Sequence, residues 1–383
     1  MALKIARRGL VPPFIVMDVL RAANDREAAG EDVLHLEVGQ PGTPAPVPVR
    51  AAAKSALESA RLGYTDAMGV PSLRARIARS YGETYGVELD PQRVIVTTGS
   101  SGGFLLGFLS SFEAGDRVAL AAPGYPAYRN ILTSLGVEPV LLPCDLAHRF
   151  QPTVELLDRV APPLDGLILA SPSNPTGTML GRAALSDLVA YCADRGVRLV
   201  SDEIYHGIAY EEPAVSALEL TDDAIVINSF SKYYSMTGWR LGWMVLPEDL
   251  LRPIECLAQN LFISPPTLSQ IAAETAFDCH EELDGYVAAY ARNRAVLLRE
   301  LPKAGFDRLA PADGAFYLYA DVSRLTNDSQ DFCRRMLAET GVAVTPGMDF
   351  DPERGHRFVR FSFAGPEVEM GKAAARLGAW LAD

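Results

Sequence analysis

The chain has 383 residues, a formal net charge of −13 at pH 7, and a composition that is 49% hydrophobic. A chain of this length can bury a large core and has room for two domains. Its acidic balance argues against nucleic acid and anionic membrane surfaces as partners, because both attract basic proteins. No stretch approaches the roughly 20 apolar residues of a membrane span.

The five cysteines are odd in number and widely scattered, and none has the C-x-x-C spacing of zinc or redox sites. Basic residues near the start of the chain precede a short apolar run that contains Pro12 and Pro13, which lacks the length of a signal-peptide core. These features predict a cytoplasmic protein without a metal site.

The region from residue 90 to 250 alternates short runs rich in Val, Ile and Leu with helical patterns, which is typical of βα units in a buried parallel sheet. The predicted strands are residues 93–97, 117–121, 138–142, 165–170, 197–202, 224–228 and 241–246. The pattern therefore predicts an α/β fold in which a mostly parallel, seven-stranded sheet lies between helices such as residues 182–195.

The pattern changes after Pro247, where long helical stretches reach about Leu301 and strands are predicted near residues 314–319 and 356–363. A predicted helix at residues 14–29 is separated from the main sheet by a proline-rich stretch. We therefore predict a large cofactor-binding domain over residues 46–283. A smaller α+β domain is predicted to combine residues 1–45 with residues 284–383.

Polar and small residues follow several of the predicted strands, at the sheet edge where ligands bind in open α/β folds. Residues 99–103 are Gly-Ser-Ser-Gly-Gly and precede a predicted helix at residues 104–111, whose free N–H groups would favour an anion. The turn Ser-Pro-Ser-Asn-Pro-Thr-Gly follows the predicted strand at residues 165–170 and presents the amide of Asn174. A phosphate cradle and a polar turn are thus predicted at one edge.

Two further strands end in groups that can do acid–base or covalent chemistry. One strand ends at Asp202, with Tyr205 three residues later, and another leads to Lys232 and then to Arg240. Each residue alone has an ordinary explanation, such as a cap, a core phenol or a surface charge. Together they would require independent coincidences at neighbouring strand ends, which favours a functional site.

The combination suits pyridoxal 5'-phosphate. A lysine amine can form a Schiff base with its aldehyde, and a carboxylate can keep its pyridine nitrogen protonated. Lys232 and Asp202 suit these roles, while Asn174 and Tyr205 can donate hydrogen bonds to the ring oxygen. Donors and one cation are available for the phosphate dianion. These phosphate candidates are Ser100, Ser101, Gly102, Ser229, Ser231 and Arg240.

The stretches SPSNPTGT, SDEIYHGIAY and SFSKYYSMTGWRLGW resemble those of the class I pyridoxal-phosphate-dependent aminotransferases of fold type I. The resemblance extends over nearly the whole chain. It implies that Lys232 is the Schiff-base lysine, that Asp202 meets the pyridine nitrogen, and that Tyr205 acts with them in catalysis. It also implies a ping-pong transfer of an amino group from an L-amino acid to a 2-oxo acid.

The resemblance implies further contacts outside the strand ends. Arg360 matches the arginine that binds the substrate α-carboxylate, and Gly39 matches a backbone position near that group. Tyr125 would stack on the cofactor ring, and Asn174 would also contact substrate. The family forms homodimers with shared active sites, in which Tyr64 would reach the phosphate held by the other subunit. The amino donor stays open between aspartate, alanine and aromatic types.

Other functions remain as alternatives. A β-elimination lyase would use the same cofactor and lysine. Residues 99–103 also match the G-x-S-x-G motif of serine hydrolases, with Ser101 as nucleophile and His280 or His356 as base, although no HGGG-type motif occurs. The S-x-x-K pattern that ends at Lys232 lacks its partner motifs. A nicotinamide dehydrogenase would need a G-x-G-x-x-G that is absent, and a regulatory protein would need a DNA-binding module.

Overall fold

A computed structural model describes residues 3–382, so the first two residues and the last residue of the predicted smaller domain lie outside the described residues. Its centre is a seven-stranded sheet with the order β2-β8-β7-β6-β5-β3-β4, in which β8 alone runs antiparallel to its neighbours. The prediction of a mostly parallel α/β sheet is confirmed, and each predicted strand overlaps an observed one. The strands are β2 (Val94–Thr97), β3 (Arg117–Ala122), β4 (Glu138–Pro143), β5 (Gly166–Ala170), β6 (Arg198–Asp202), β7 (Ile225–Ser229) and β8 (Gly242–Val245).

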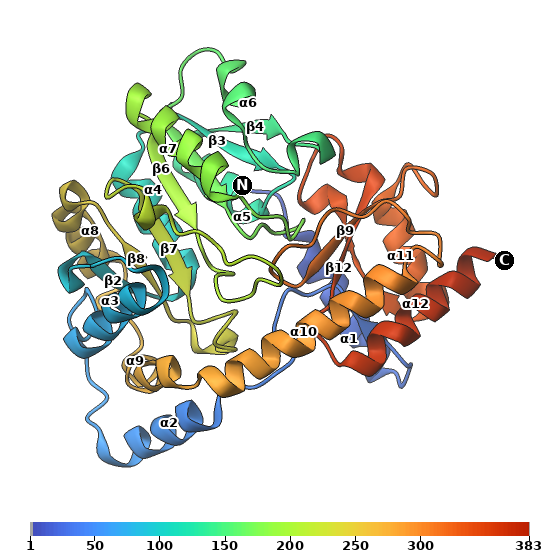
Figure 1. Cartoon of the computed structure of the whole chain (residues 1–383), viewed down its shortest axis with the longest axis horizontal. Helices are drawn as coiled ribbons and strands as arrows, with labels where there is room; N and C mark the ends of the chain where they lie inside the picture. Colours follow the sequence, from blue (N-terminus) through green and yellow to red (C-terminus); the bar gives the residue numbers. More distant parts are fainter. Residues whose placement is uncertain (1–2, 383) are drawn as a thin grey trace.

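Helices cover both faces of this sheet (Figure 1). Because side chains alternate along a strand, Val94 and Val96 pack into one hydrophobic cluster while Ile95 packs into another on the opposite face. The first cluster includes side chains of α2 (Val47–Ser59), α3 (Pro71–Tyr85), α7 (Arg182–Arg195) and α9 (Thr267–Glu274), with α6 (Val154–Asp158) near α7. The second includes those of α4 (Gly99–Ser111), α5 (Pro126–Leu135) and α8 (Glu248–Leu261). Apart from β4 at the edge of the sheet, the strands are therefore largely buried on both faces, which explains their continuous apolar runs.

Helix α4 begins at Gly99 rather than at Phe104, so the predicted helix start is wrong. Glycine and serine disfavour a helix interior, which is why the sequence suggested a turn over these residues. Tertiary packing outweighs that preference, because a Cβ at Gly103 would lie 3.2 Å from Met244 Cγ and 3.3 Å from Ile227 Cγ2. The small residues thus let α4 lie close against β7 and β8.

A second group of elements surrounds a three-stranded antiparallel sheet with the order β11-β12-β9. The predicted helix at residues 14–29 is confirmed as α1, which lies among these C-terminal elements in Figure 1 and contacts β10 and β11. Strand β1 pairs in parallel with β10. These elements are α1 (Ile15–Ala28), β1 (Leu34–His35), β9 (Tyr317–Asp321), α11 (Ser329–Thr340), β10 (Val342–Ala343), β11 (Thr345–Pro346), β12 (Phe358–Ser362) and α12 (Glu367–Ala382).

The long helix α10 (His280–Glu300) runs from the first group of elements to the second (Figure 1). Its Leu283 packs into a cluster of the seven-stranded sheet, whereas Tyr290 and Leu297 pack into the cluster around β9 and β12. The division of the chain at residue 283 stays a prediction. Within residues 3–382, no helix combines the length and apolarity that crossing a membrane requires.

Candidate active site

The polar residues that follow β2, β5, β6 and β7 meet in a cavity of about 180 Å³, together with residues from the second group of elements. This location is the one expected for ligands in open α/β sheets. Eleven of the fourteen predicted site residues line it: Gly39, Ser100, Ser101, Tyr125, Asn174, Asp202, Tyr205, Ser231, Lys232, Arg240 and Arg360.

Lys232 lies three residues after the end of β7, and its Nζ donates a hydrogen bond to the carbonyl oxygen of Gly39 at 2.6 Å. Burial lowers the pKa of this ammonium group to about 8, and the positive charges of Arg360 and Arg240 act in the same direction. An appreciable share of the amine is therefore neutral near neutral pH. A neutral amine is the form that attacks a carbonyl carbon or accepts a proton.

Asp202 is the last residue of β6 and is almost fully buried. The hydroxyl of Tyr128 donates to its Oδ2, and the backbone N–H of Ile204 donates to its Oδ1 at 3.0 Å. Burial raises the pKa of Asp202 to about 6 although both hydrogen bonds oppose that rise. A carboxylate in this position would favour a positively charged ligand group beside it.

Arg360 extends from β12 and is only 3% exposed. Its guanidinium donates to Asn174 Oδ1 at 2.8 Å, to Thr345 Oγ1 at 3.2 Å and to the carbonyl oxygen of Glu37, and it lies 4.4 Å from the ring centroid of Tyr317. These acceptors are neutral, and Nε has no partner within residues 3–382. A buried cation whose hydrogen-bond acceptors are all neutral can bind an anionic ligand group.

The first turn of α4 and Arg240 form a second anion-binding region. Gly99 has a φ of +67°, and a Cβ there would lie 2.4 Å from Nη2 of Arg240, so the arginine packs directly on this backbone. Arg240 also donates to the carbonyl oxygen of Thr237 at 3.0 Å. Free N–H groups at a helix N-terminus and a guanidinium together suit a phosphate. Ser100 and Ser101 belong to this first turn and also line the cavity.

Three predicted residues do not line the cavity. Gly102 is buried inside the first turn of α4. Ser229 lies behind Ser231, because its hydroxyl donates to the carbonyl oxygen of Leu241 at 2.9 Å and is 2.8 Å from Ser231 Oγ. Tyr64 is 84% exposed on the surface of the chain. Within one chain, the structure therefore does not place these three residues in the lining of the cavity.

The sequence prediction missed two phenols of the site. Tyr128 binds Asp202, and Tyr317 bonds to Tyr205 with an oxygen–oxygen distance of 2.6 Å. The first has a usable signal, since it follows Tyr125 by three residues at the start of α5 and so lies near it on one helix face. Tyr317 has no such signal, because the sequence does not distinguish a tyrosine in a buried strand from an ordinary core residue.

An apolar wall closes one side of the cavity. It is formed by Phe14, Val16 and Met17 at the start of α1, and the ring of Phe14 meets Tyr125 edge-on at 5.7 Å. The α1 N-terminus has no cap from its own residues. Instead both carboxylate oxygens of the distant Asp349 accept its first N–H groups at 3.1 Å. The start of α1 therefore contributes apolar side chains to the cavity.

Comparison with known proteins agrees with this geometry. Residues 31–377 match the family described as aminotransferase class I and II. The chain is 53% identical over 382 residues to the valine–pyruvate aminotransferase of Mycobacterium tuberculosis, covering 99% of this chain and 98% of that protein. A crystal structure of an aminotransferase from Mycobacterium tuberculosis superposes with a TM-score of 0.98 at 52% identity and covers 100% of both chains. An aspartate aminotransferase from Thermus thermophilus with maleate gives 0.92 at 29% identity, covering 99% of this chain and 100% of that chain.

The chain therefore belongs to the family of class I and II aminotransferases, as the strand-end motifs predicted. It is an enzyme that transfers amino groups. Of the two reactions left open by the sequence, family membership favours transamination over β-elimination. The serine-hydrolase alternative is wrong. Ser101 does line the cavity, but neither His280 nor His356, the two bases predicted for it, does.

Proposed function

We propose that Lys232 holds pyridoxal 5'-phosphate as a Schiff base in this cavity and that the chain moves an amino group between an L-amino acid and a 2-oxo acid. The observation that supports this most directly is the meeting of Lys232, Asp202 and Arg360 in one cavity. The donor set fits the cofactor, because an amine, a buried carboxylate and an anion-binding helix end match its aldehyde, pyridine nitrogen and phosphate. When bound, the cofactor supplies an electron sink for the bond broken at the substrate Cα.

The chain's own residues then have separate tasks. Lys232 would hold the cofactor through its aldehyde, and its neutral amine would move a proton away from the substrate Cα and return it to the cofactor's former aldehyde carbon. Asp202 keeps the pyridine nitrogen protonated by its negative charge. Asn174 and Tyr205 donate hydrogen bonds to the ring oxygen, and Arg360 binds the α-carboxylate so that the Cα–H points at Lys232.

The cavity supports a neutral, apolar amino donor with a small 2-oxo acid as acceptor. Three cations line it within residues 3–382, and the proposal above assigns Lys232 and Arg240 to the cofactor and Arg360 to the α-carboxylate. No lining cation is left for a second substrate carboxylate, while Phe14, Val16, Met17 and Val38 offer apolar contact. The valine and pyruvate in the name of the 53% identical relative agree with this assignment.

A donor panel tests this function. Valine, alanine, phenylalanine and aspartate are each offered with pyruvate and with 2-oxoglutarate, and the 2-oxo acid products are measured. We expect valine or alanine with pyruvate to give the highest kcat/KM. A buried charge without a partner is costly, so aspartate should be at least about 10²-fold poorer. An aspartate preference would contradict the donor class, and no transfer by any pair would contradict the function.

We propose further that the active enzyme is a homodimer. The family resemblance assigns Tyr64 to the phosphate held by the other subunit, and its exposure of 84% leaves it available to a partner. The apolar residues Leu62 and Ile263 are also exposed, which supports a contact surface for the second subunit. We also propose that residues 46–283 form the large, cofactor-binding domain and that residues 1–45 and 284–383 form the smaller one.

We expect substitution of Arg360 to act mainly on KM. Arg360→Lys keeps the charge but loses the two-pronged contact, so the KM of donor and acceptor should both rise by about 10-fold. Arg360→Gln also loses the charge and should raise both by roughly 10²-fold, since hydrogen bonds to charged groups contribute about 1.5–3 kcal/mol each. Steady-state kinetics measure both values. A change confined to one of the two substrates would contradict a shared carboxylate site.

The lowered pKa of Lys232 predicts how the cofactor-free protein takes up pyridoxal phosphate. Only the neutral amine reacts with the aldehyde, so the rate of uptake should rise with pH and level off above about 8, rather than above the usual lysine range. Stopped-flow absorbance measures this rate. Arg360→Gln removes a positive charge that lowers this pKa, so its profile should move to higher pH. A rate that still climbs steeply at pH 10 in the unsubstituted protein would contradict the prediction.

A further inference from the structure

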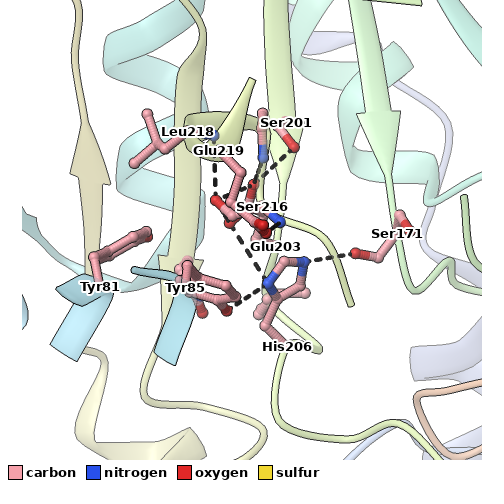
Figure 2. Close-up of polar contacts among 12 residues, drawn as sticks. Tyr81, Tyr85, Ser171, Ser201, Glu203, His206, Ser216, Leu218 and Glu219 are labelled. Atoms are coloured by element: carbon pink, nitrogen blue, oxygen red, sulfur yellow. Dashed lines mark hydrogen bonds and ion pairs between the residues drawn. The ribbon is translucent and has the colours of Figure 1, made fainter. Parts of the chain in front are cut away.

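A buried polar network lies next to the cavity without lining it, and the proposed chemistry makes no use of it (Figure 2). His206 is its centre. One ring nitrogen, Nδ1, lies 2.7 Å from the hydroxyl of Tyr85, and the other, Nε2, lies 3.0 Å from the backbone carbonyl oxygen of Ser171. Burial lowers the pKa of the His206 imidazole to about 4, so the ring is neutral at physiological pH.

The partners fix which nitrogen of the ring bears the proton. A carbonyl oxygen only accepts hydrogen bonds, so Nε2 must donate to Ser171. In a neutral ring Nδ1 is then the acceptor, and the hydroxyl of Tyr85 donates to it. His206 is therefore a directed link, with its donor aimed at one backbone oxygen.

Glu203 anchors the residue from which this link extends. Its carboxylate accepts from the backbone N–H of Ala217 at 2.8 Å and from the hydroxyls of Ser216 and Ser201, at 2.9 Å and 3.2 Å for the nearest oxygen. The backbone carbonyl of Glu203 accepts the N–H of His206 at 3.0 Å. The gap of 3.6 Å from Glu203 Oε2 to His206 Nδ1 is too long for a hydrogen bond. Glu203 thus fixes the end of β6, and His206 extends from that fixed point.

The link joins two segments that carry proposed cofactor contacts. Strands β5 and β6 pair as far as Ala170 and Asp202, and the N–H of Ser171 still reaches the Asp202 carbonyl oxygen at 3.3 Å. Beyond this pair the His206 ring supplies the next bond, to the carbonyl of Ser171. That residue opens the turn bearing Asn174, whose Oδ1 accepts from Arg360 and whose amide nitrogen is left to donate elsewhere.

We propose that His206 is a positioning residue that sets the spacing between the Asn174 turn and the strand end bearing Asp202. These are the two residues assigned to the ring nitrogen and the ring oxygen of the cofactor, so the inference rests on the proposed function. Through Ser171, the histidine holds the Asn174 amide where it donates to the ring oxygen. A loosened turn weakens that donation, and the proton shared between the ring oxygen and the Lys232 nitrogen is then bound more tightly.

The test compares variants that keep or remove the donor. Gln places an amide nitrogen near the position of Nε2, whereas Asn reaches only the position of Nδ1, and Phe keeps the ring volume without any donor. The absorbance of the Lys232-bound cofactor is titrated with pH in His206→Gln, His206→Asn, His206→Phe and the unsubstituted protein. His206→Asn and His206→Phe have no donor at the Nε2 position and are called the donorless variants. We expect both to raise the spectroscopic pKa by about half a unit, whereas His206→Gln should stay within about 0.2 unit of the unsubstituted protein.

Tyr85→Phe is the matched control, because it removes the hydroxyl at Nδ1 and leaves the bond to Ser171. Its spectroscopic pKa should match that of the unsubstituted protein. Thermal melting without cofactor identifies any variant that does not fold, and either donorless variant suffices for the comparison. The proposal is overturned if the donorless variants titrate like the unsubstituted protein, or if His206→Gln and Tyr85→Phe shift as far as they do. An unsubstituted protein with no cofactor absorbance would instead contradict the proposed function.

Discussion

Replacing Lys232 with alanine should abolish transamination while the cofactor still binds. The lysine has two tasks in the proposed chemistry, the covalent attachment of the cofactor and the transfer of a proton at the substrate Cα. General acid–base catalysis alone contributes about 10²–10⁴-fold, so the loss in kcat should be roughly 10⁴-fold or more. The hydrogen bond from Nζ to the Gly39 carbonyl is also lost, but it leaves the phosphate-binding helix end untouched.

The measurement is a single-turnover assay with the preferred donor, beside a binding titration of pyridoxal phosphate. The matched control is Lys303→Ala, which removes an exposed lysine paired with Glu300 at 3.0 Å and should leave both readings unchanged. A Lys232→Ala protein with more than a few per cent of the original rate would show that another group moves the proton.

Replacing Asp202 with asparagine should lower kcat by about 10²- to 10³-fold. The amide has nearly the same size but no negative charge, so it cannot keep the pyridine nitrogen protonated. Removing one member of a buried charge pair costs about 3–5 kcal/mol, and each 1.36 kcal/mol is tenfold in rate. Affinity for the cofactor should fall as well, because the buried pair stabilises the bound form.

The stability of the cofactor-free protein should not fall when Asp202 is replaced with asparagine. Burial raises the pKa of Asp202 from 3.8 to about 6, so the folded state binds its proton more tightly than the unfolded state does. Ionisation of Asp202 then costs stability as the pH rises from about 4 to 6, by up to about 3 kcal/mol above that range. At pH 7.5 the cofactor-free Asp202→Asn protein should therefore be at least as stable as the unsubstituted one.

Urea unfolding at pH 4.5 and 7.5, beside kinetics at pH 7.5, separates the two effects. Asp187→Asn in α7 is the matched control, since Asp187 is exposed and should change neither quantity. A variant that keeps its rate would show that Asp202 does not serve the pyridine nitrogen. A variant that loses stability at pH 7.5 as well as its rate would indicate general damage to the fold.

The sheet and much of the site could be predicted from the sequence, because buried strands and the polar residues after them differ clearly in composition. A strand buried on both faces must be apolar throughout, so the central strands of the sheet stand out as short runs of Val, Ile and Leu. The polar residues that follow them stand out by contrast. Asn174, Asp202 and Lys232 were found in this way, and the structure brings all three to one cavity.

The rest depended on contacts between residues far apart in the chain. Asp349 caps α1 across a separation of 333 residues, and no local pattern predicts which helix a buried aspartate will cap. The start of α4 was misplaced because close packing on Met244 outweighs helix propensity. Tyr317 and His206 act through hydrogen bonds to Tyr205 and to the Ser171 backbone, so neither has a signature at its own position.

In the proposed function, Lys232 is covalently linked to pyridoxal phosphate. The most direct measurement is reduction of the cofactor-loaded protein with sodium borohydride, which converts the carbon–nitrogen double bond into a stable secondary amine, followed by digestion and mass spectrometry. We predict a phosphopyridoxyl group on the peptide that contains Lys232 and its disappearance when substrate is added before reduction. A stable adduct on any other lysine, or none in protein that has bound the cofactor, would contradict the account.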